Sequence, residues 1–280
     1  MHCSGKECFT LSKKVQALCY ITIIVVALSL TAILYMLMPA CSNCGRKFCF
    51  GNCVITYGDS GTPGNGSLRP SIPKSNQTTT RLTETELQDE SYLDDIYFVG
   101  DSRTVALTAY GIPEERVFAK DGLNHLHALD EEVVRLAEDK MVTIPDAVMI
   151  TAPQIMIVNF GINGAAYLSK EEFLEGYGTM IDTLIQSSPN SIIVIESILP
   201  VADFYEAKEG SVTNEEIDDL NAGLYQMAMD KGLYYLATNE AMKNENNDVN
   251  PDYTTDGLHY NQAGCEVILN YIRSHAILFQ

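Results

Sequence analysis

Residues of the types that activate a serine as a nucleophile occur at two separate places in this 280-residue chain. Ser102 lies in the run Gly100-Asp101-Ser102, and Asp256 and His259 lie three residues apart near the C-terminus. A serine hydroxyl is a weak nucleophile at neutral pH, so it needs a histidine to take its proton and a carboxylate to fix the histidine tautomer. A single loop can supply both Asp256 and His259. These residues therefore predict nucleophilic acyl transfer through an acyl-enzyme, with His259 as the base.

The two loops can act together only if a fold brings them to one place. Short apolar runs predict five strands, and apolar residues at helical spacing predict helices between and after them. Ser169-x-x-Glu172 and Thr213-x-x-Glu216 are capping boxes that predict the starts of two helices. This alternation predicts an α/β domain with about five parallel strands covered by helices on both faces. The predicted strands are 96–99, 117–119, 155–160, 192–197 and 233–237, and the helical patterns span 126–136, 173–184, 217–227 and 267–272.

In a parallel α/β sheet, ligands bind at the carboxyl ends of the strands. Ser102 follows the first predicted strand, Gly122 follows the second and Asn163 follows the third. Gly100 permits a tight turn before Ser102, and a helix beginning there would aim its N-terminal N–H groups at a developing oxyanion. Each of these short motifs is weak alone. Their order along successive strand ends favours a single catalytic site.

Residues 92–278 resemble the SGNH/GDSL hydrolase family. FVGDSRT is similar to the family's first block, Gly122 to its second, GIN to its third and DGLH to its fifth. The resemblance implies a three-layer α/β/α, flavodoxin-like fold and hydrolysis of esters. It further implies catalytic roles for Ser102, Asp256 and His259, with no cofactor and no metal.

The resemblance also implies an oxyanion hole. Its donors would be the backbone N–H groups of Ser102 and Gly122 and the side-chain amide of Asn163, each contributing on the order of 3 kcal/mol. Many members of the family have Asp after this Asn, whereas this chain has Gly164. Since the Asn is the donor, we expect activity to be retained and the local support of Asn163 to differ.

A run of apolar residues without charges extends over residues 15–40. At about 1.5 Å per residue, a helix of this length crosses the ~30 Å hydrocarbon core of a bilayer. A cleaved signal peptide is the alternative, but the run exceeds a usual apolar core region and no A-x-A site follows it. Basic residues slightly favour the N-terminal side, which predicts a cytoplasmic tail at residues 1–14 and a single-pass anchor in the cell membrane. The C-terminal domain would be extracytoplasmic, as in a membrane-anchored member of bacterial type.

A cluster of four cysteines lies in the predicted juxtamembrane segment, residues 41–55. Two disulfides with three possible pairings are one interpretation, and a zinc site is the other. Zinc sites usually separate their ligand pairs by a longer segment, and an extracytoplasmic location favours disulfides. The cysteines concerned are Cys41, Cys44, Cys49 and Cys53.

Residues 56–90 are rich in Gly, Ser, Thr, Asn and Pro and show almost no apolar periodicity, which predicts a flexible linker before a hydrolase domain at residues 91–280. The linker contains Gly58-Asp59-Ser60, which repeats three letters of the Ser102 motif without its flanking residues. Motifs of three residues recur by chance. We therefore assign no catalytic role to Ser60.

Charge narrows the range of partners. The formal net charge is −19; residues 1–90 hold eight Lys/Arg against six Asp/Glu, so residues 91–280 hold the remaining ten against 31, a net of −21. Such a field repels polyanions, which argues against nucleic acid and favours neutral or cationic substrates. An esterase tethered outside the cytoplasm meets cell-envelope glycans, so an acetylated glycan is the expected ester substrate. A lipid or small ester stays open, as do two alternative functions: a non-catalytic envelope-binding module and an acyltransferase using the same triad.

Several further residues invite a functional interpretation. His125 and His127 lack carboxylate or cysteine partners at ligand spacing, so we expect no metal there. Arg103 follows the nucleophile and could contact the substrate, although a structural salt bridge is the simpler expectation. Cys265 falls in the last helical pattern and is expected to be a small core residue. The aromatic residues that could wall a crevice or pack loops after the third and fourth strands are Tyr167, Phe204 and Tyr205.

Overall fold

The computed structural model describes residues 78–136, 140–206, 208 and 210–279. These residues belong to one compact unit, Ser67–Gln280. Of the helices in the described ranges, none has both the length and the apolar character needed to cross a bilayer. The predicted membrane segment, the four-cysteine cluster and Gly58-Asp59-Ser60 all lie outside the described residues.

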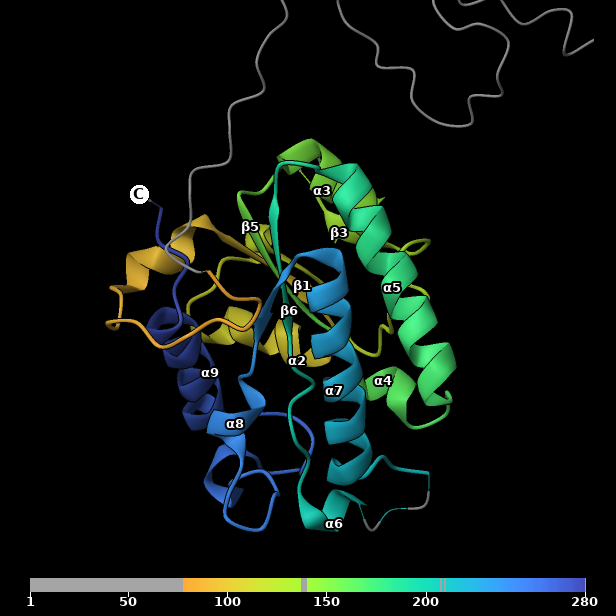
Figure 1. The fold of residues 1–280 in the computed structure, drawn as a ribbon, viewed down its shortest axis with the longest axis vertical. Helices are drawn as coiled ribbons and strands as arrows, with labels where there is room; N and C mark the ends of the chain where they lie inside the picture. The colour runs from red at the N-terminus through yellow and green to blue at the C-terminus, as the bar shows by residue number, and fades with distance from the viewer. Residues whose placement is uncertain (1–77, 137–139, 207, 209, 280) are drawn as a thin grey trace, which may run out of the picture. The chain divides into compact units, whose positions relative to one another are not determined.

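Five parallel strands form the central sheet (Figure 1). Their order, β2-β1-β5-β6-β7, is the flavodoxin-like order, in which the first two strands along the chain exchange places. The predicted sheet of about five parallel strands is thus confirmed. The strands are β1 (Ile96–Gly100), β2 (Val117–Ala119), β5 (Ile155–Asn159), β6 (Ile192–Glu196) and β7 (Tyr234–Leu236).

Both faces of the sheet are buried. Side chains of successive strand residues point to opposite faces, so each strand contributes to both apolar clusters. In β5, Met156 and Val158 join one apolar cluster, whereas Ile155 and Ile157 join the other. The first cluster includes residues of α3 (Ile144–Thr151), α5 (Lys170–Ser187) and α7 (Asn214–Lys231), and the second includes residues of α9 (Gln262–Ser274) and the 3₁₀ segment η2 (Ala106–Tyr110). Helices therefore cover both faces in three layers (Figure 1).

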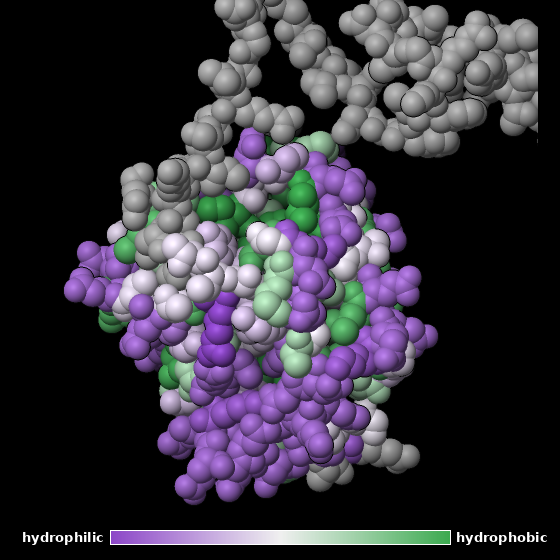
Figure 2. Space-filling model, viewed as in Figure 1, coloured by the Kyte–Doolittle hydropathy of each residue, from purple (hydrophilic) through white to green (hydrophobic). Residues whose placement is uncertain are grey.

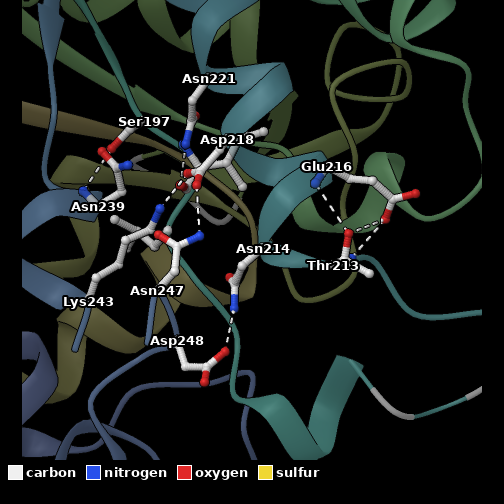
Figure 3. Close-up of polar contacts among 12 residues, drawn as sticks. Ser197, Thr213, Asn214, Glu216, Asp218, Asn221, Asn239, Lys243, Asn247 and Asp248 are labelled. Carbon is white, nitrogen blue, oxygen red and sulfur yellow. Dashed lines mark hydrogen bonds and ion pairs between the residues drawn. The ribbon is translucent and has the colours of Figure 1, made fainter. Parts of the chain in front are cut away.

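The two predicted capping boxes begin the two longest described helices. At α5, the Ser169 hydroxyl accepts from the Glu172 N–H at 3.3 Å, and the Glu172 carboxylate accepts from the Ser169 N–H at 3.0 Å. At α7, Thr213 and Glu216 make the same exchange at 3.2 and 2.8 Å (Figure 3). These bonds satisfy N–H groups that have no partner within the helix, so both starts are fixed by local sequence.

The predicted helix across residues 126–136 is wrong. The chain forms turns up to residue 131 and then a hairpin in which β3 (Glu132–Arg135) pairs antiparallel with β4 (Met141–Thr143). The Asn124 side chain accepts from the N–H groups of Leu126 and His127, which stabilises the turn. The β-branched pair Val133-Val134 then favours an extended chain. Leu126 is exposed, so the apparent helical period did not describe a buried face.

Part of the predicted linker is bonded to the domain. The Tyr235 N–H of β7 donates to the Thr80 carbonyl at 2.7 Å, and the Tyr235 carbonyl accepts from the Leu82 N–H at 2.9 Å. Further along the chain, the Thr85 N–H donates to the carbonyl of Ser274, the last residue of α9. Leu82 is buried. The remaining short elements are η1 (Glu90–Asp95), α2 (Ser102–Val105), η3 (Glu114–Arg116), α4 (Ile162–Ala165), α6 (Asp203–Glu206), α8 (Asn239–Met242) and η5 (Pro251–Tyr253).

Candidate active site

The nucleophile turn joins β1 to α2. Asp101 is buried and caps α2, since its carboxylate accepts from the Arg103 N–H at 3.0 Å. Burial raises the pKa of Asp101 to about 6, an effect that the neighbouring Arg103 charge opposes. Gly100 is required by space, because a Cβ there would lie 2.4 Å from the Asn159 carbonyl oxygen of β5. Because β1 ends at Gly100, Ser102 lies just beyond the carboxyl end of this strand of the central sheet.

Ser102, His259 and Asp256 form a continuous hydrogen-bonded line. The Ser102 Oγ lies 3.0 Å from His259 Nε2, and His259 Nδ1 lies 2.7 Å from an Asp256 carboxylate oxygen. The other Asp256 oxygen accepts from the N–H groups of Leu258 and His259 at 2.8 and 2.7 Å. Although desolvation raises the pKa of Asp256, these hydrogen bonds lower it to about 2. A permanently ionised carboxylate can therefore hold the Nδ1–H tautomer, which leaves Nε2 free to accept the serine proton.

The loop that carries His259 is fixed at several points. The Thr254 hydroxyl donates to the His259 carbonyl at 2.7 Å and accepts from the Gly257 N–H at 3.0 Å. Gly257 has φ 84°, a left-handed conformation that favours glycine, and its carbonyl accepts from the Ala202 N–H at 2.9 Å. The loop is thus joined to the segment that follows β6.

Arg103 links the nucleophile turn to both of these segments. Its buried guanidinium group donates to the carbonyls of Leu258 at 3.0 Å, Leu199 at 2.8 Å and Pro200 at 3.4 Å, and it lies over the Tyr260 ring. The sequence suggests a substrate contact or a salt bridge for Arg103, and the structure shows neither role. The side chain is buried, and it donates to backbone carbonyls rather than to a carboxylate. A guanidinium fork can serve three carbonyls in different directions. Arg103 therefore connects the Ser102 turn directly to the loop before His259.

Helix α7 holds the other edge of the same segment. Asn221 accepts from the Ile198 N–H at 2.7 Å and donates to its carbonyl at 2.9 Å, and Asn214 makes the equivalent pair with Val201 at 2.9 and 2.8 Å. Both asparagines project from α7 among the polar contacts of Figure 3, where Asn214 also reaches Asp248. The segment 198–201 is therefore hydrogen-bonded on both sides, to α7 and to Arg103, which also binds the loop before His259.

Leu123 joins the segments that carry two of the predicted oxyanion donors, Gly122 and Asn163. Asn163 donates from Nδ2 to the Leu123 carbonyl at 3.0 Å, which ties the start of α4 to the turn that contains Gly122. Gly122 has φ 74°, which favours glycine, although a Cβ there would meet nothing within 4 Å. A primary amide carries two N–H groups, so one N–H of Asn163 stays available for an oxyanion.

Gly164 stands where an Asp was expected, and His125 explains the difference. A Cβ at Gly164 would lie 2.9 Å from the His125 ring, and one at Gly176 of α5 would lie 3.2 Å from it. The imidazole is buried between these helices, with its ring centroid 4.5 Å from that of Phe173. Burial lowers the pKa of His125 to about 4, although the nearby Phe173 backbone acts to raise it. Neither ring nitrogen of His125 has a hydrogen bond of normal geometry. A neutral imidazole thus fills the space between α4, which carries Asn163, and α5.

A buried polar layer lies beneath the site and has no counterpart in the sequence predictions. Glu196, the last residue of β6, accepts from Asn159 Nδ2 at 2.9 Å and from the Thr238 hydroxyl at 2.6 Å. Burial raises the pKa of Glu196 to about 7, although both hydrogen bonds oppose the rise. The one available signal was a glutamate that ends an otherwise apolar strand.

Other expectations can be placed as well. Within the described ranges, His, Cys, Asp and Glu side chains form no group of three or more suited to a metal ion. His125 is buried and His127 is exposed. Cys265 lies in the core, and burial raises the pKa of its thiol to about 12. Of the predicted crevice residues, Tyr167 and Phe204 are exposed and Tyr205 is partly buried.

The sequence is similar to one known protein family. The sequence profile of the GDSL-like lipase/acylhydrolase family matches residues 56–267. The chain matches no curated protein. An acylhydrolase from Bacteroides fragilis has a similar structure, with TM-score 0.50 and 20% identity over 72% of this chain and 88% of that one.

Two further solved structures resemble the chain. A GDSL-like lipase from Bacteroides thetaiotaomicron gives TM-score 0.47 and 20% identity over 62% of this chain and 83% of that one. A family 3 carbohydrate esterase from Clostridium thermocellum gives TM-score 0.43 and 18% identity over 63% and 91%. Since the family profile covers most of the chain, the chain belongs to the GDSL-like lipase/acylhydrolase family and is a carboxylic ester hydrolase.

Proposed function

We propose that the chain is a serine esterase in which Ser102, His259 and Asp256 form the catalytic triad. The observation that carries this proposal is the line from Ser102 Oγ to His259 Nε2 at 3.0 Å and from His259 Nδ1 to Asp256 at 2.7 Å. These distances lie within the range over which a base can take a proton from a nucleophile and a carboxylate can orient the base.

The reaction proceeds in two half-reactions. Ser102 Oγ attacks the ester carbonyl carbon while His259 Nε2 takes its proton, and the N–H groups of Ser102, Gly122 and Asn163 stabilise the oxyanion. Collapse of the tetrahedral intermediate breaks the bond to the alcohol, which receives the proton from His259. Water, deprotonated by His259, then attacks the acyl carbon. Collapse of this second tetrahedral intermediate breaks the bond to Ser102 Oγ, which takes back the proton from His259 as the acid is released. The ionised Asp256 stabilises the imidazolium ion in each half-reaction.

The proposed substrate is an acetyl ester on a neutral cell-envelope glycan. The strongly acidic domain disfavours polyanionic substrates. The His259 side chain is 45% exposed, so a group attached to a long polymer can approach the triad from solvent. The apolar run at residues 15–40 supports placing the domain at the outer side of the cell membrane, where such glycans occur.

Labelling with a fluorophosphonate tests the proposal, because covalent capture needs an activated serine and an open oxyanion site. We expect the full chain to be labelled, Ser102→Ala to lose both labelling and turnover of p-nitrophenyl acetate, and Ser60→Ala to match the wild type. Folding of each variant is checked by circular dichroism. A folded wild-type protein that resists a probe able to label a control hydrolase would contradict the proposed triad.

A further inference from the structure

Two exposed aromatic rings border the proposed active site. Among the exposed large hydrophobic side chains of the described residues, Tyr167 at 61% and Phe204 at 51% are the aromatic ones. Tyr167 follows α4 and Phe204 lies in α6, and these helices come after the neighbouring parallel strands β5 and β6. An exposed aromatic ring leaves a large apolar face in water and is a favourable contact for a ligand with an apolar face of its own.

Tyr167 lies on the oxyanion side of the site. It is four residues after Asn163, the predicted oxyanion donor, and its hydroxyl accepts from Asn124 Nδ2 at 2.6 Å. Asn124 follows Leu123, the residue whose carbonyl binds Asn163. The hydrogen bond orients the phenol, although the residue as a whole is 61% exposed, so the ring is held next to the donor-bearing loops before any ligand arrives.

Phe204 lies on the base side of the site. A Cβ at Gly257 would lie 2.7 Å from Phe204 Cε2, so the ring packs directly against the turn between Asp256 and His259. Gly257 also accepts from the Ala202 N–H, two residues before Phe204. The small residue at 257 thus lets the Phe204 ring sit beside the catalytic loop while about half of its surface faces solvent.

We propose that Tyr167 and Phe204 form two sugar-binding subsites on the oxyanion and base sides of Ser102, each stacking against a ring of an O-acetylated glycan. This inference rests on the proposed function. A sugar ring presents an apolar C–H face with a hydroxyl rim, which matches a single flat aromatic face among polar groups. A long acyl chain would instead need a continuous apolar groove, but the surface around α6 and α8 is mostly hydrophilic on the face that Figure 2 shows.

Kinetics with two classes of substrate test the subsites. Wild-type protein is compared with Tyr167→Ala and Phe204→Ala on p-nitrophenyl acetate and on O-acetylated β-1,4-linked tetrasaccharides of xylose, mannose and N-acetylglucosamine. We expect each substitution to lower kcat/KM on a tetrasaccharide roughly tenfold more than on p-nitrophenyl acetate, mainly by raising KM for the tetrasaccharide. Met229→Ala removes an exposed apolar side chain near the end of α7 and serves as the matched control.

Conservative variants separate ring stacking from apolar contact. Phe204→Tyr keeps a flat face and should retain tetrasaccharide activity, whereas Phe204→Leu keeps apolar character without that face and should lose it. Tyr167→Phe keeps the ring but removes the hydrogen bond from Asn124 that orients it, so its loss of tetrasaccharide activity should be smaller than that of Tyr167→Ala. A parallel assay with p-nitrophenyl octanoate should show no selective loss in any variant.

Several outcomes would overturn the subsites while leaving the esterase proposal intact. These are unchanged tetrasaccharide kinetics in both alanine variants, equal losses on both acetyl substrates, a loss confined to the octanoate, or a wild-type protein that cleaves p-nitrophenyl acetate but none of the tetrasaccharides. Failure of the wild type to cleave any ester, together with no fluorophosphonate labelling, would overturn the proposed function itself.

Discussion

The base side and the oxyanion side of the candidate site are held in different ways. On the base side, side chains bind backbone groups directly: Asp256 accepts from its own loop, and Arg103 donates to Leu258. On the oxyanion side, one hydrogen bond joins Asn163 directly to Leu123, the Asn124 side chain closes the neighbouring turn, and the His125 ring packs against α4 and α5. Hydrogen bonds fix direction as well as distance, whereas packing fixes only the space available. We therefore expect the base side to fail abruptly when altered and the oxyanion side to fail gradually.

The largest effect should come from breaking the base side at its centre. Asp256→Asn keeps the size of the side chain but allows the wrong His259 tautomer, so we expect kcat on p-nitrophenyl acetate to fall about 10⁴-fold. His259→Ala should cost at least as much. The double variant should be little worse than His259→Ala, because residues that act as one unit are strongly non-additive. The measurement is kcat for all three variants, with fold verified by circular dichroism.

The pH profile sharpens the same prediction. The pKa of Asp256 is held at about 2, so its carboxylate stays ionised throughout the range in which the enzyme is assayed. Activity should still fall on acidification, because only a neutral His259 can accept the Ser102 proton. If the kcat losses of Asp256→Asn and His259→Ala were additive in the double variant, Asp256 and His259 would not act as one unit, and the assigned triad would be wrong.

This side of the site was largely predictable from the sequence, because its contacts are local. Asp256 and His259 are three residues apart, and the turn that joins them is closed by their own backbone and side chains. The strand before Ser102 was predicted to within one residue. The role of Arg103 was not predictable, since its acceptors, Leu199 and Leu258, are 96 and 155 residues away along the chain.

The oxyanion side should show a smaller, graded effect when its packing is disturbed. Gly164→Ala would place a Cβ 2.9 Å from His125 and displace either the ring or α4, which carries Asn163. A displaced Asn163 would donate less well to the oxyanion, and losing about 1.4 kcal/mol of that transition-state stabilisation would lower kcat on p-nitrophenyl acetate about tenfold with little change in KM. Steady-state kinetics at 25 °C measure the effect.

Two comparisons make this prediction specific. Gly178→Ala adds a methyl group to α5, where it would meet only the flexible end of Met227 at 3.6 Å, and should leave kcat unchanged. Adding His125→Ala to Gly164→Ala removes the clashing ring and should recover part of the lost rate. A Gly164→Ala enzyme with wild-type kinetics would show that this packing does not position Asn163.

The oxyanion side was less predictable, because a lone glycine in an irregular turn has few neighbours that identify it. Gly122 was matched only by its place after a short strand, and the segment that follows it, predicted as a helix, contains turns and the β3–β4 hairpin. His125 was considered only as a metal ligand. Its packing depends on Gly164 and Gly176, which become its neighbours only in the folded chain.

The smallest effect should appear in the polar layer beneath both sides, and in stability rather than in rate. The pKa of Glu196 is raised to about 7 from an ordinary 4.5, so the folded state holds a proton that the unfolded state has already released between these values. The stability that this proton contributes is fully present below pH 4.5 and is lost as the pH rises through 7. Glu196→Gln fixes the neutral form, and it should melt at about the same temperature as the wild type at pH 5 but roughly 5 °C higher at pH 8. Thermal unfolding at the two pH values measures this difference, with Glu175→Gln on the exposed face of α5 as the control that should behave as the wild type does.

The Glu196 carboxylate binds Asn159 and Thr238 and not the Ser102 or His259 side chain. Turnover of p-nitrophenyl acetate should therefore change less in Glu196→Gln than in either earlier set of variants. If the difference in melting temperature between Glu196→Gln and the wild type were the same at pH 5 and pH 8, burial would not raise the pKa of Glu196. The Glu196 carboxyl would then not be held in its neutral form in this layer.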